Sequence, residues 1–233
     1  RIIGNDLFPR HAKGQSFGSV SFILKHEPVL QNCDKYWVLN RIRDTQEKAR
    51  IMDLLSSAKQ KFIDIPFDLT EYQSIGWDFD DLPNPGFFAS KAFSELDPEQ
   101  MMRAHVAAYR HKNIYLMNNN GARNLALNEG AGQAKWVLPW DGNCYVTQQG
   151  WSDIRQAVAA SPRRRYFITP MQRLTDNTAL LGDTFMPEPL EEPQVIFRRD
   201  APERFNTAFP YGRRPKVELL WRLGAHGLWD RWR

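Results

Sequence analysis

The chain has 233 residues, of which 42% are hydrophobic and 25% charged, and its formal net charge is +4. This is the composition of a globular protein, and a chain of this length buries enough surface to fold without disulfides or a structural metal. No apolar run approaches the roughly 20 residues that cross a bilayer, and no secretory signal is recognisable. We expect a single domain over residues 1–233, excised from a longer protein because it starts at Arg1 in what reads as a strand.

Cysteine and arginine usage narrows the class further. Cys33 and Cys144 are too few for a disulfide framework or a zinc site, and free thiols fit a cytoplasmic location. Basic residues gather at 163–165, 198–199 and 213–216, where they can steer phosphorylated ligands or anionic lipid, or form a solvated face. No DNA- or RNA-binding signature accompanies them, so no nucleic acid partner is expected. Peripheral contact with a membrane or with a fused domain stays open.

Strand and helix patterns alternate in the first third of the chain. Helical spacing predicts a helix that Ser16 caps and that ends near Glu27, and a second helix that Asp44 caps. Apolar runs predict strands at residues 1–7, 35–40 and 61–66. The order strand, helix, strand, helix, strand is typical of a parallel α/β sheet.

The alternation of strand and helix patterns stops after the third predicted strand. Residues 68–97 are rich in aromatics, Asp, Pro and Gly without any period, and we expect an irregular excursion over the sheet edge that serves as a lid. The later patterns predict a helix at 99–116 with Pro98 in its first turn, a turn at 118–121, a helix at 122–129, a strand at 134–140, a helix capped by Thr147, strands at 165–169 and 194–198, and a helix at 217–223.

The strand at 134–140 leads directly into Asp141-Gly142-Asn143. Open α/β sheets bind ligands at the carboxyl ends of their strands, so this strand delivers Asp141 to a ligand-binding edge. A carboxylate followed two residues later by an amide oxygen offers the hard ligands that suit a divalent cation bound together with a nucleotide's phosphates. We expect Mn²⁺ or Mg²⁺ here, held by Asp141 and Asn143.

The helix at 122–129 begins beside Asn120-Gly121. Free N–H groups at a helix start can receive phosphate oxygens. Arg123 lies in the first turn, where the helix dipole disfavours a cation, so its presence there indicates an anionic partner. Together with the strand that ends at Asp141, this pattern suggests a diphosphate.

Ala122-Arg123-Asn124, followed by a hydrophobic strand that ends in Asp141-Gly142-Asn143, resembles the central segment of inverting family 2 glycosyltransferases with the nucleotide-sugar-binding A-type fold. The order of elements agrees from residue 1 to about residue 151. The resemblance implies a three-layer α/β/α sandwich with a mostly parallel central sheet. It also implies metal-assisted, inverting transfer of a sugar from a nucleoside-diphosphate sugar donor to a saccharide acceptor, with residues 187–233 on the acceptor side.

The same resemblance assigns roles to individual residues. The catalytic base is expected to be Glu218, with Asp176 as the next candidate. His226 completes the metal shell of Asp141 and Asn143, or is a surface turn residue. The residues expected to bind the nucleotide sugar are Asn5, Asp6, Arg41, Asn120, Arg123, Asn124 and Asp141.

Two departures from the family pattern keep other functions open. Asn143 stands where the family has a second Asp, and Pro215 and Lys216 fall where its late acidic pair belongs. A catalytically inactive relative that binds a glycan or a protein is therefore the alternative. A nucleotidyltransferase ranks third, because the first loop is not rich in glycine.

Overall fold

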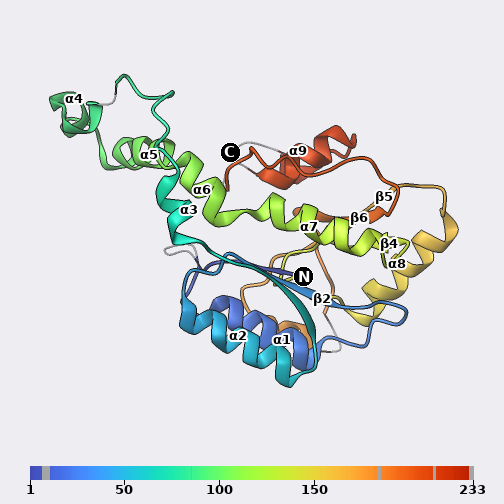
Figure 1. Cartoon of the computed structure of the whole chain (residues 1–233). Helices are drawn as coiled ribbons and strands as arrows, with labels where there is room; N and C mark the ends of the chain where they lie inside the picture. The colour runs from blue at the N-terminus through green and yellow to red at the C-terminus, as the bar shows by residue number, and fades with distance from the viewer. Residues whose placement is uncertain (7–10, 85, 183–184, 212–213, 231–233) are drawn as a thin grey trace.

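The strands in the described part of the chain form two three-stranded sheets (Figure 1). The computed structural model describes residues 1–6, 11–84, 86–182, 185–211 and 214–230. The first sheet contains β1 (Ile2–Ile3), β2 (Tyr36–Asn40) and β3 (Lys61–Ile65), which pair in that order and run parallel. The second contains β4 (Trp136–Val137), β6 (Glu191–Arg198) and β5 (Tyr166–Met171), with β6 in the middle and antiparallel to both neighbours. The predicted α/β class is confirmed, with a parallel sheet built from the first three strands.

A parallel bridge between Ile2 of β1 and Asp141, four residues after the end of β4, links the two sheets. The Ile2 N–H donates to the Trp140 carbonyl at 2.9 Å, and the Gly142 N–H donates to the Ile2 carbonyl at 2.7 Å. A Cβ at position 142 would lie 2.7 Å from that carbonyl oxygen, so glycine is required for the close approach. The bridge holds Asp141 beside the first parallel strand.

Replacing Gly142 with alanine is expected to lower the free energy of unfolding by roughly 1–3 kcal/mol, because the added methyl group meets backbone on β1. Urea denaturation measures the change. Gly132→Ala is the matched control, since its nearest neighbour would be the Glu129 carbonyl at 3.8 Å. Equal stability of the two variants would contradict the tight junction.

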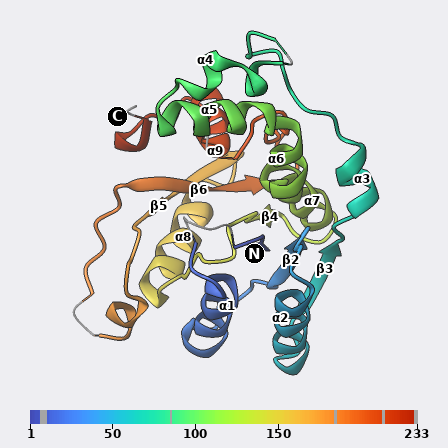
Figure 2. The same cartoon turned by 90° about the vertical axis from the view of Figure 1, so that its left-hand side faces the viewer.

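Helices cover both faces of the parallel sheet (Figures 1 and 2). Side chains alternate along β2, so Trp37 and Leu39 pack in a core cluster with α1 and α2. Val38 packs on the other face against Ala122 of α7. The three helices are α1 (Gln15–His26), α2 (Thr45–Ser57) and α7 (Asn119–Ala131).

The second sheet is also packed on both sides. Ile196 of β6 lies in a cluster with Trp151 of α8 (Gln148–Ala160). Val195 and Phe197, its neighbours in sequence, pack with α7 and α9 (Pro215–Arg222) on the opposite face. Figure 2 shows α1, α2 and α8 on one side of the strands and α7 and α9 on the other.

Most predicted helix ends are confirmed, and the cap of the first helix is corrected. α1 ends at His26, and Asp44 and Thr147 cap α2 and α8 as expected. The N-cap of α1 is Gly14 in a left-handed conformation, not Ser16. The backbone N–H and the hydroxyl of Ser16 both donate to Asp6 instead. Position 7 of the predicted first strand and position 213 of a basic cluster lie outside the described residues.

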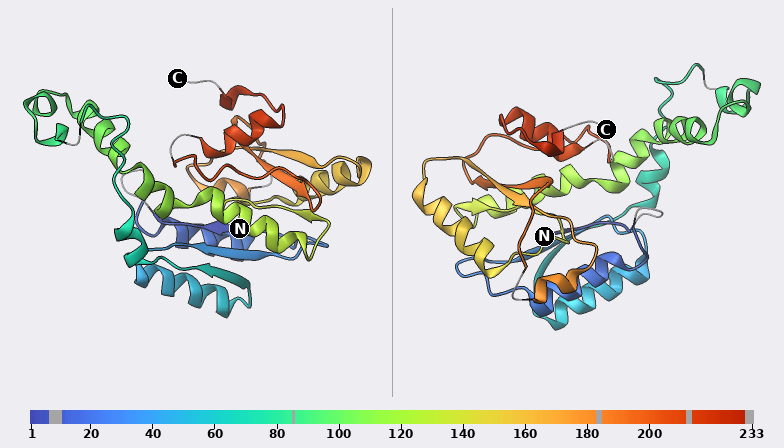
Figure 3. Two further views of the ribbon diagram at one scale, coloured as in Figure 1. Left: turned by 45° about the horizontal axis from the view of Figure 1, so that its top comes forward. Right: turned by 180° about the vertical axis from the view of Figure 1, so that it is seen from behind.

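Residues 68–97 contain short helices, so the predicted irregular excursion is wrong in part. These are α3 (Leu69–Ser74), the 3-10 turn η1 (Phe87–Ala89) and α4 (Lys91–Ser94). Figures 1 and 3 show α4, together with α5, extending away from the two sheets.

The single helix predicted at 99–116 is two helices, α5 (Pro98–Ala108) and α6 (Arg110–Met117). The break follows from a long-range contact, because the Ala108 carbonyl accepts the Asp78 N–H at 2.9 Å. No periodicity in the sequence reports such a bond. Within the described residues, no helix combines the length and apolar character that a membrane span requires.

The predicted turn at 118–121 is shorter than expected. Only Asn118 leaves the helical conformation, with φ of 39°, and α7 already begins at Asn119. The Asn118 amide donates to the side chain of buried Asn40 at 3.0 Å. This contact fixes the start of α7 over the end of β2.

Candidate functional site

Three elements converge on the Asp141 carboxylate at the junction of the two sheets. Arg123 of α7 donates from Nη2 to Oδ1 at 2.6 Å. Gln194 of β6 donates from Nε2 to Oδ2 at 3.0 Å. The Lys216 ammonium of α9 lies 3.7 Å from Oδ2. Both carboxylate oxygens therefore have partners within the protein.

Lys216 links Asp141 to a second carboxylate. Its Nζ lies 3.2 Å from Oε1 of Glu192, which stands two residues before Gln194 on β6. Lys216 and Arg123 are both buried, with side chains 4% and 5% exposed, whereas Asp141 is 36% exposed. Asp141 is thus half-buried, and its two cationic partners are almost fully buried.

The charge state of Asp141 follows from this arrangement. Burial alone would raise the pKa of its carboxyl group, but the positive charges of Arg123 and Lys216 and the hydrogen bond from Gln194 hold that pKa well below its usual range. Its contribution to stability is present above the pKa of an unfolded aspartate, about 3.9, and is lost only as pH falls through the depressed value. Asp141 therefore stays ionised throughout the neutral range.

A cavity of about 1510 Å³ opens in front of these residues. Typical small-molecule sites enclose roughly 300–1,000 Å³, so this space admits a ligand with a nucleotide and a sugar. Arg123, Asp141, Glu192, Gln194 and Lys216 form part of its lining. Side chains of α1 and of residues 169–180 line other parts of it.

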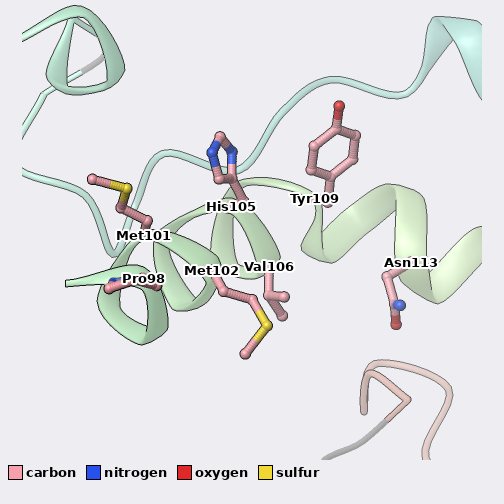
Figure 4. A pocket seen from close by; sticks show the side chains of 7 residues that line it. All are labelled: Pro98, Met101, Met102, His105, Val106, Tyr109 and Asn113. Carbon is pink, nitrogen blue, oxygen red and sulfur yellow. The ribbon is translucent and has the colours of Figure 1, made fainter. Parts of the chain in front are cut away.

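A second pocket, of about 570 Å³, lies on α5 and α6 at the projecting end of the molecule. It contains no Lys, Arg, Asp or Glu side chain among the described residues, so it is unsuited to a phosphorylated ligand. Its lining, drawn in Figure 4, is Pro98, Met101, Met102, His105, Val106, Tyr109 and Asn113.

Three residues expected to bind the nucleotide hold loops together. Asn5 donates to the Arg41 carbonyl at 2.8 Å and accepts the Arg43 N–H at the same distance. Asp6 accepts from Ser16 at the start of α1. The Arg41 guanidinium donates to the Tyr115 carbonyl and lies 3.7 Å from the centre of the Tyr115 ring. None of the three is among the described residues that line the cavity.

The asparagines of α7 likewise position the backbone. Asn120 donates to the Asn206 carbonyl at 2.7 Å and accepts from Arg123 at 2.9 Å. Asn124 donates to the carbonyl of Phe205 and accepts its N–H, both at 2.9 Å. These bonds fix the chain that leads into α9, and with it the position of Lys216.

Of the three expected metal ligands, Asp141 and Asn143 lie in the cavity wall and His226 does not. Asn143 is exposed in the cavity wall, but the His226 ring faces Asp230, 3.8 Å away, and does not line the cavity. Within the described part of the chain, no three His, Cys, Asp or Glu side chains are grouped so as to hold a metal ion. Asp141 is the one carboxylate of the expected ligand set, and two cations already lie within 4 Å of it.

Neither expected base is among the described residues of the cavity lining, although Thr175 and Asn177, on either side of Asp176, are. Glu218 accepts from Arg222 one turn later on α9. Asp176 accepts from the backbone and the hydroxyl of Thr178, as the cap of a 3-10 turn. The carboxylates among the described lining residues are Asp141, Glu191 and Glu192.

Sequence reasoning missed Glu192, Gln194 and Lys216 as members of the site. The sequence contains a signal for the first two. Glu192 and Gln194 are two residues apart, so their side chains lie on one face of a strand. The strand continues into buried Val195. Lys216 falls where the resembled family has an acid, and its buried ammonium now contacts Asp141. The sequence shows that a lysine replaces an acid at position 216, but it does not show that this lysine lies beside Asp141.

Cys144 lies beside the site, with its sulfur 3.2 Å from the Gln194 amide. Burial, followed by the charge of Asp141, raises the pKa of the thiol to about 11. At pH 8 only about one thiol in a thousand is then ionised, so in a Cys33→Ser protein we expect iodoacetamide to label Cys144 roughly 100-fold more slowly in the native than in the denatured state. Mass spectrometry measures the rate, and equal rates would contradict the buried thiol.

Comparisons of the chain with protein-family models, with curated proteins and with solved structures give no match. The functional assignment therefore depends on the chemistry of the residues around Asp141.

Proposed function

We propose that the chain is a glycosyltransferase-like domain that transfers a sugar, with inversion, from a nucleoside-diphosphate sugar to a saccharide acceptor. The observation that carries the proposal is the pair of buried cations, Arg123 and Lys216, held by Asp141 in the wall of a large cavity. Fixed cations at the carboxyl end of a sheet suit the diphosphate of such a donor.

The finer fold assignment belongs to the same proposal. Through the Ile2–Asp141 bridge, the two sheets act as one central sheet between two layers of helices, which is the α/β/α sandwich that the family resemblance implies. The bridge supports this assignment, because it lies at the place where the donor site is expected.

The reaction needs a cation beside the leaving group and a base beside the acceptor. The acceptor hydroxyl oxygen attacks the anomeric carbon on the face opposite the diphosphate. The bond from that carbon to the diphosphate breaks, and its electron pair leaves with the diphosphate, whose charge Arg123 and Lys216 offset. Glu192, a half-buried carboxylate in the cavity wall, takes the hydroxyl proton.

A catalytically inactive, glycan-binding relative is the second candidate. Lys216 lies between Asp141 and Glu192, so its ammonium has two carboxylate partners in the absence of a ligand. This function predicts saccharide binding without turnover of any donor.

Thermal unfolding with nucleoside diphosphates of the five common bases, each with Mn²⁺, tests the proposal. A ligand at 100 times its dissociation constant adds about 2.7 kcal/mol to the stability of the folded state, which raises Tm by several degrees. We expect one nucleotide to give this rise in the native protein and a smaller one in Asp141→Ala. No rise with any nucleotide would sink the proposal, and saccharide binding without donor turnover would favour the second candidate.

A further inference from the structure

We infer that the diphosphate site works without a divalent cation, because Lys216 and Arg123 supply the positive charge that a metal ion would supply. The inference rests on the proposed function. Its first support is that both oxygens of Asp141 already have donors, since Oδ1 accepts from Arg123 at 2.6 Å and Oδ2 accepts from Gln194 at 3.0 Å. A metal ion bound to either oxygen would have to share it with a donor already in place.

Electrostatics adds a second reason. The Lys216 Nζ lies 3.7 Å from Asp141 Oδ2, and Arg123 Nη2 lies on the other oxygen. A divalent cation bound to this carboxylate would lie within a few ångströms of two fixed positive charges, in a site whose cationic side chains are buried. The donor set therefore does not fit a divalent cation.

The two cations are equipped to bind an anion. The Arg123 Nε–H is buried and has no hydrogen-bond partner among the described residues. The Lys216 ammonium has three N–H donors, and two carboxylates are the ion-pair partners that the described residues give it. A phosphate oxygen would satisfy donors that the protein leaves over.

The formal charge of the described cavity lining also favours an anion. Four Lys and Arg side chains and three carboxylates are among the described residues of the cavity lining, so that part of the wall has one positive charge in excess. The cations are Arg123, Arg173, Arg214 and Lys216. Asp141 then acts as a positioning residue, which holds Arg123 and Lys216 in place for the diphosphate.

Isothermal titration with the nucleoside diphosphate that binds best, in EDTA and in Mn²⁺, tests the inference. We expect dissociation constants that agree within about threefold in the two buffers, and no binding of Mn²⁺ alone. Lys216→Met should weaken binding roughly 30-fold or more in both buffers, and Lys216→Arg should restore most of it. Lys135→Met, at the exposed far end of β4, is the charge-matched control and should bind as the native protein does. Circular dichroism checks that each variant is folded.

The outcomes separate the inference from the proposed function. Binding that requires Mn²⁺ would overturn the metal-free site and leave the donor site standing. Unchanged binding in folded Lys216→Met would overturn the role of Lys216. Absence of binding in both buffers, for every nucleotide, would instead remove the proposed function itself.

Discussion

Replacing Glu192 with glutamine is expected to lower sugar transfer by about 10²- to 10⁴-fold while the donor still binds, because an amide cannot accept the proton of the acceptor hydroxyl. Glu192 lies 3.2 Å from Lys216 and faces the cavity, so its carboxylate is near the cations that receive the diphosphate. Initial rates of transfer, together with the dissociation constant of the donor, measure the two effects separately.

Glu188 provides the matched control for this substitution. It precedes β6, is exposed and does not line the cavity, so Glu188→Gln should transfer sugar at the native rate. Native turnover in Glu192→Gln would exclude Glu192 as the base.

Replacing Trp140 with alanine is expected to lower the free energy of unfolding by about 3–5 kcal/mol. Its side chain is 2% exposed and packs with Trp151 and Ile196, and its indole N–H donates to the Val195 carbonyl at 3.0 Å. Alanine would leave a cavity and an unpaired carbonyl group next to the sheet junction.

Urea denaturation checks this expectation against a second tryptophan. Trp221 lies on α9 with 65% of its surface exposed, so Trp221→Ala should change stability by no more than about 0.5 kcal/mol. Similar losses in the two variants would mean that Trp140 is not part of the core.

Sequence patterns predicted two helix caps that are formed by hydrogen bonds between residues close in sequence. Asp44 caps α2 and Thr147 caps α8 through bonds to backbone groups two or three residues away, and such bonds are visible in sequence. The break between α5 and α6 depends on Asp78, 30 positions earlier, and no local pattern contains it. α3 and α4 were missed for another reason, since Asp68 and Ser90 cap them through local bonds but the segment around them has no regular period.

In the candidate site too, the sequence indicated individual residues but not the contacts between them. Arg123 and Asp141 were expected to share an anionic ligand, and in the structure they contact each other at 2.6 Å. An arginine in the first turn of a helix indicates that an anion is near, but not whether that anion belongs to the protein. Lys216 was noted as part of a basic cluster and as a departure from an acidic pattern, but not as a partner of Asp141, because its distance from Asp141 depends on how α9 packs.

The convergence on Asp141 also determines when the site can exist during synthesis. Its partners come from positions 123, 194 and 216, so the carboxylate leaves the ribosome well before Gln194 and Lys216 are made. Contacts between residues so far apart in sequence are slow to form. The parallel sheet, whose strands all precede residue 66, can assemble first, and the cationic pair is complete only after α9 docks. A newly made chain therefore completes the contacts around Asp141, and with them the proposed anion site, as one of its last steps of folding.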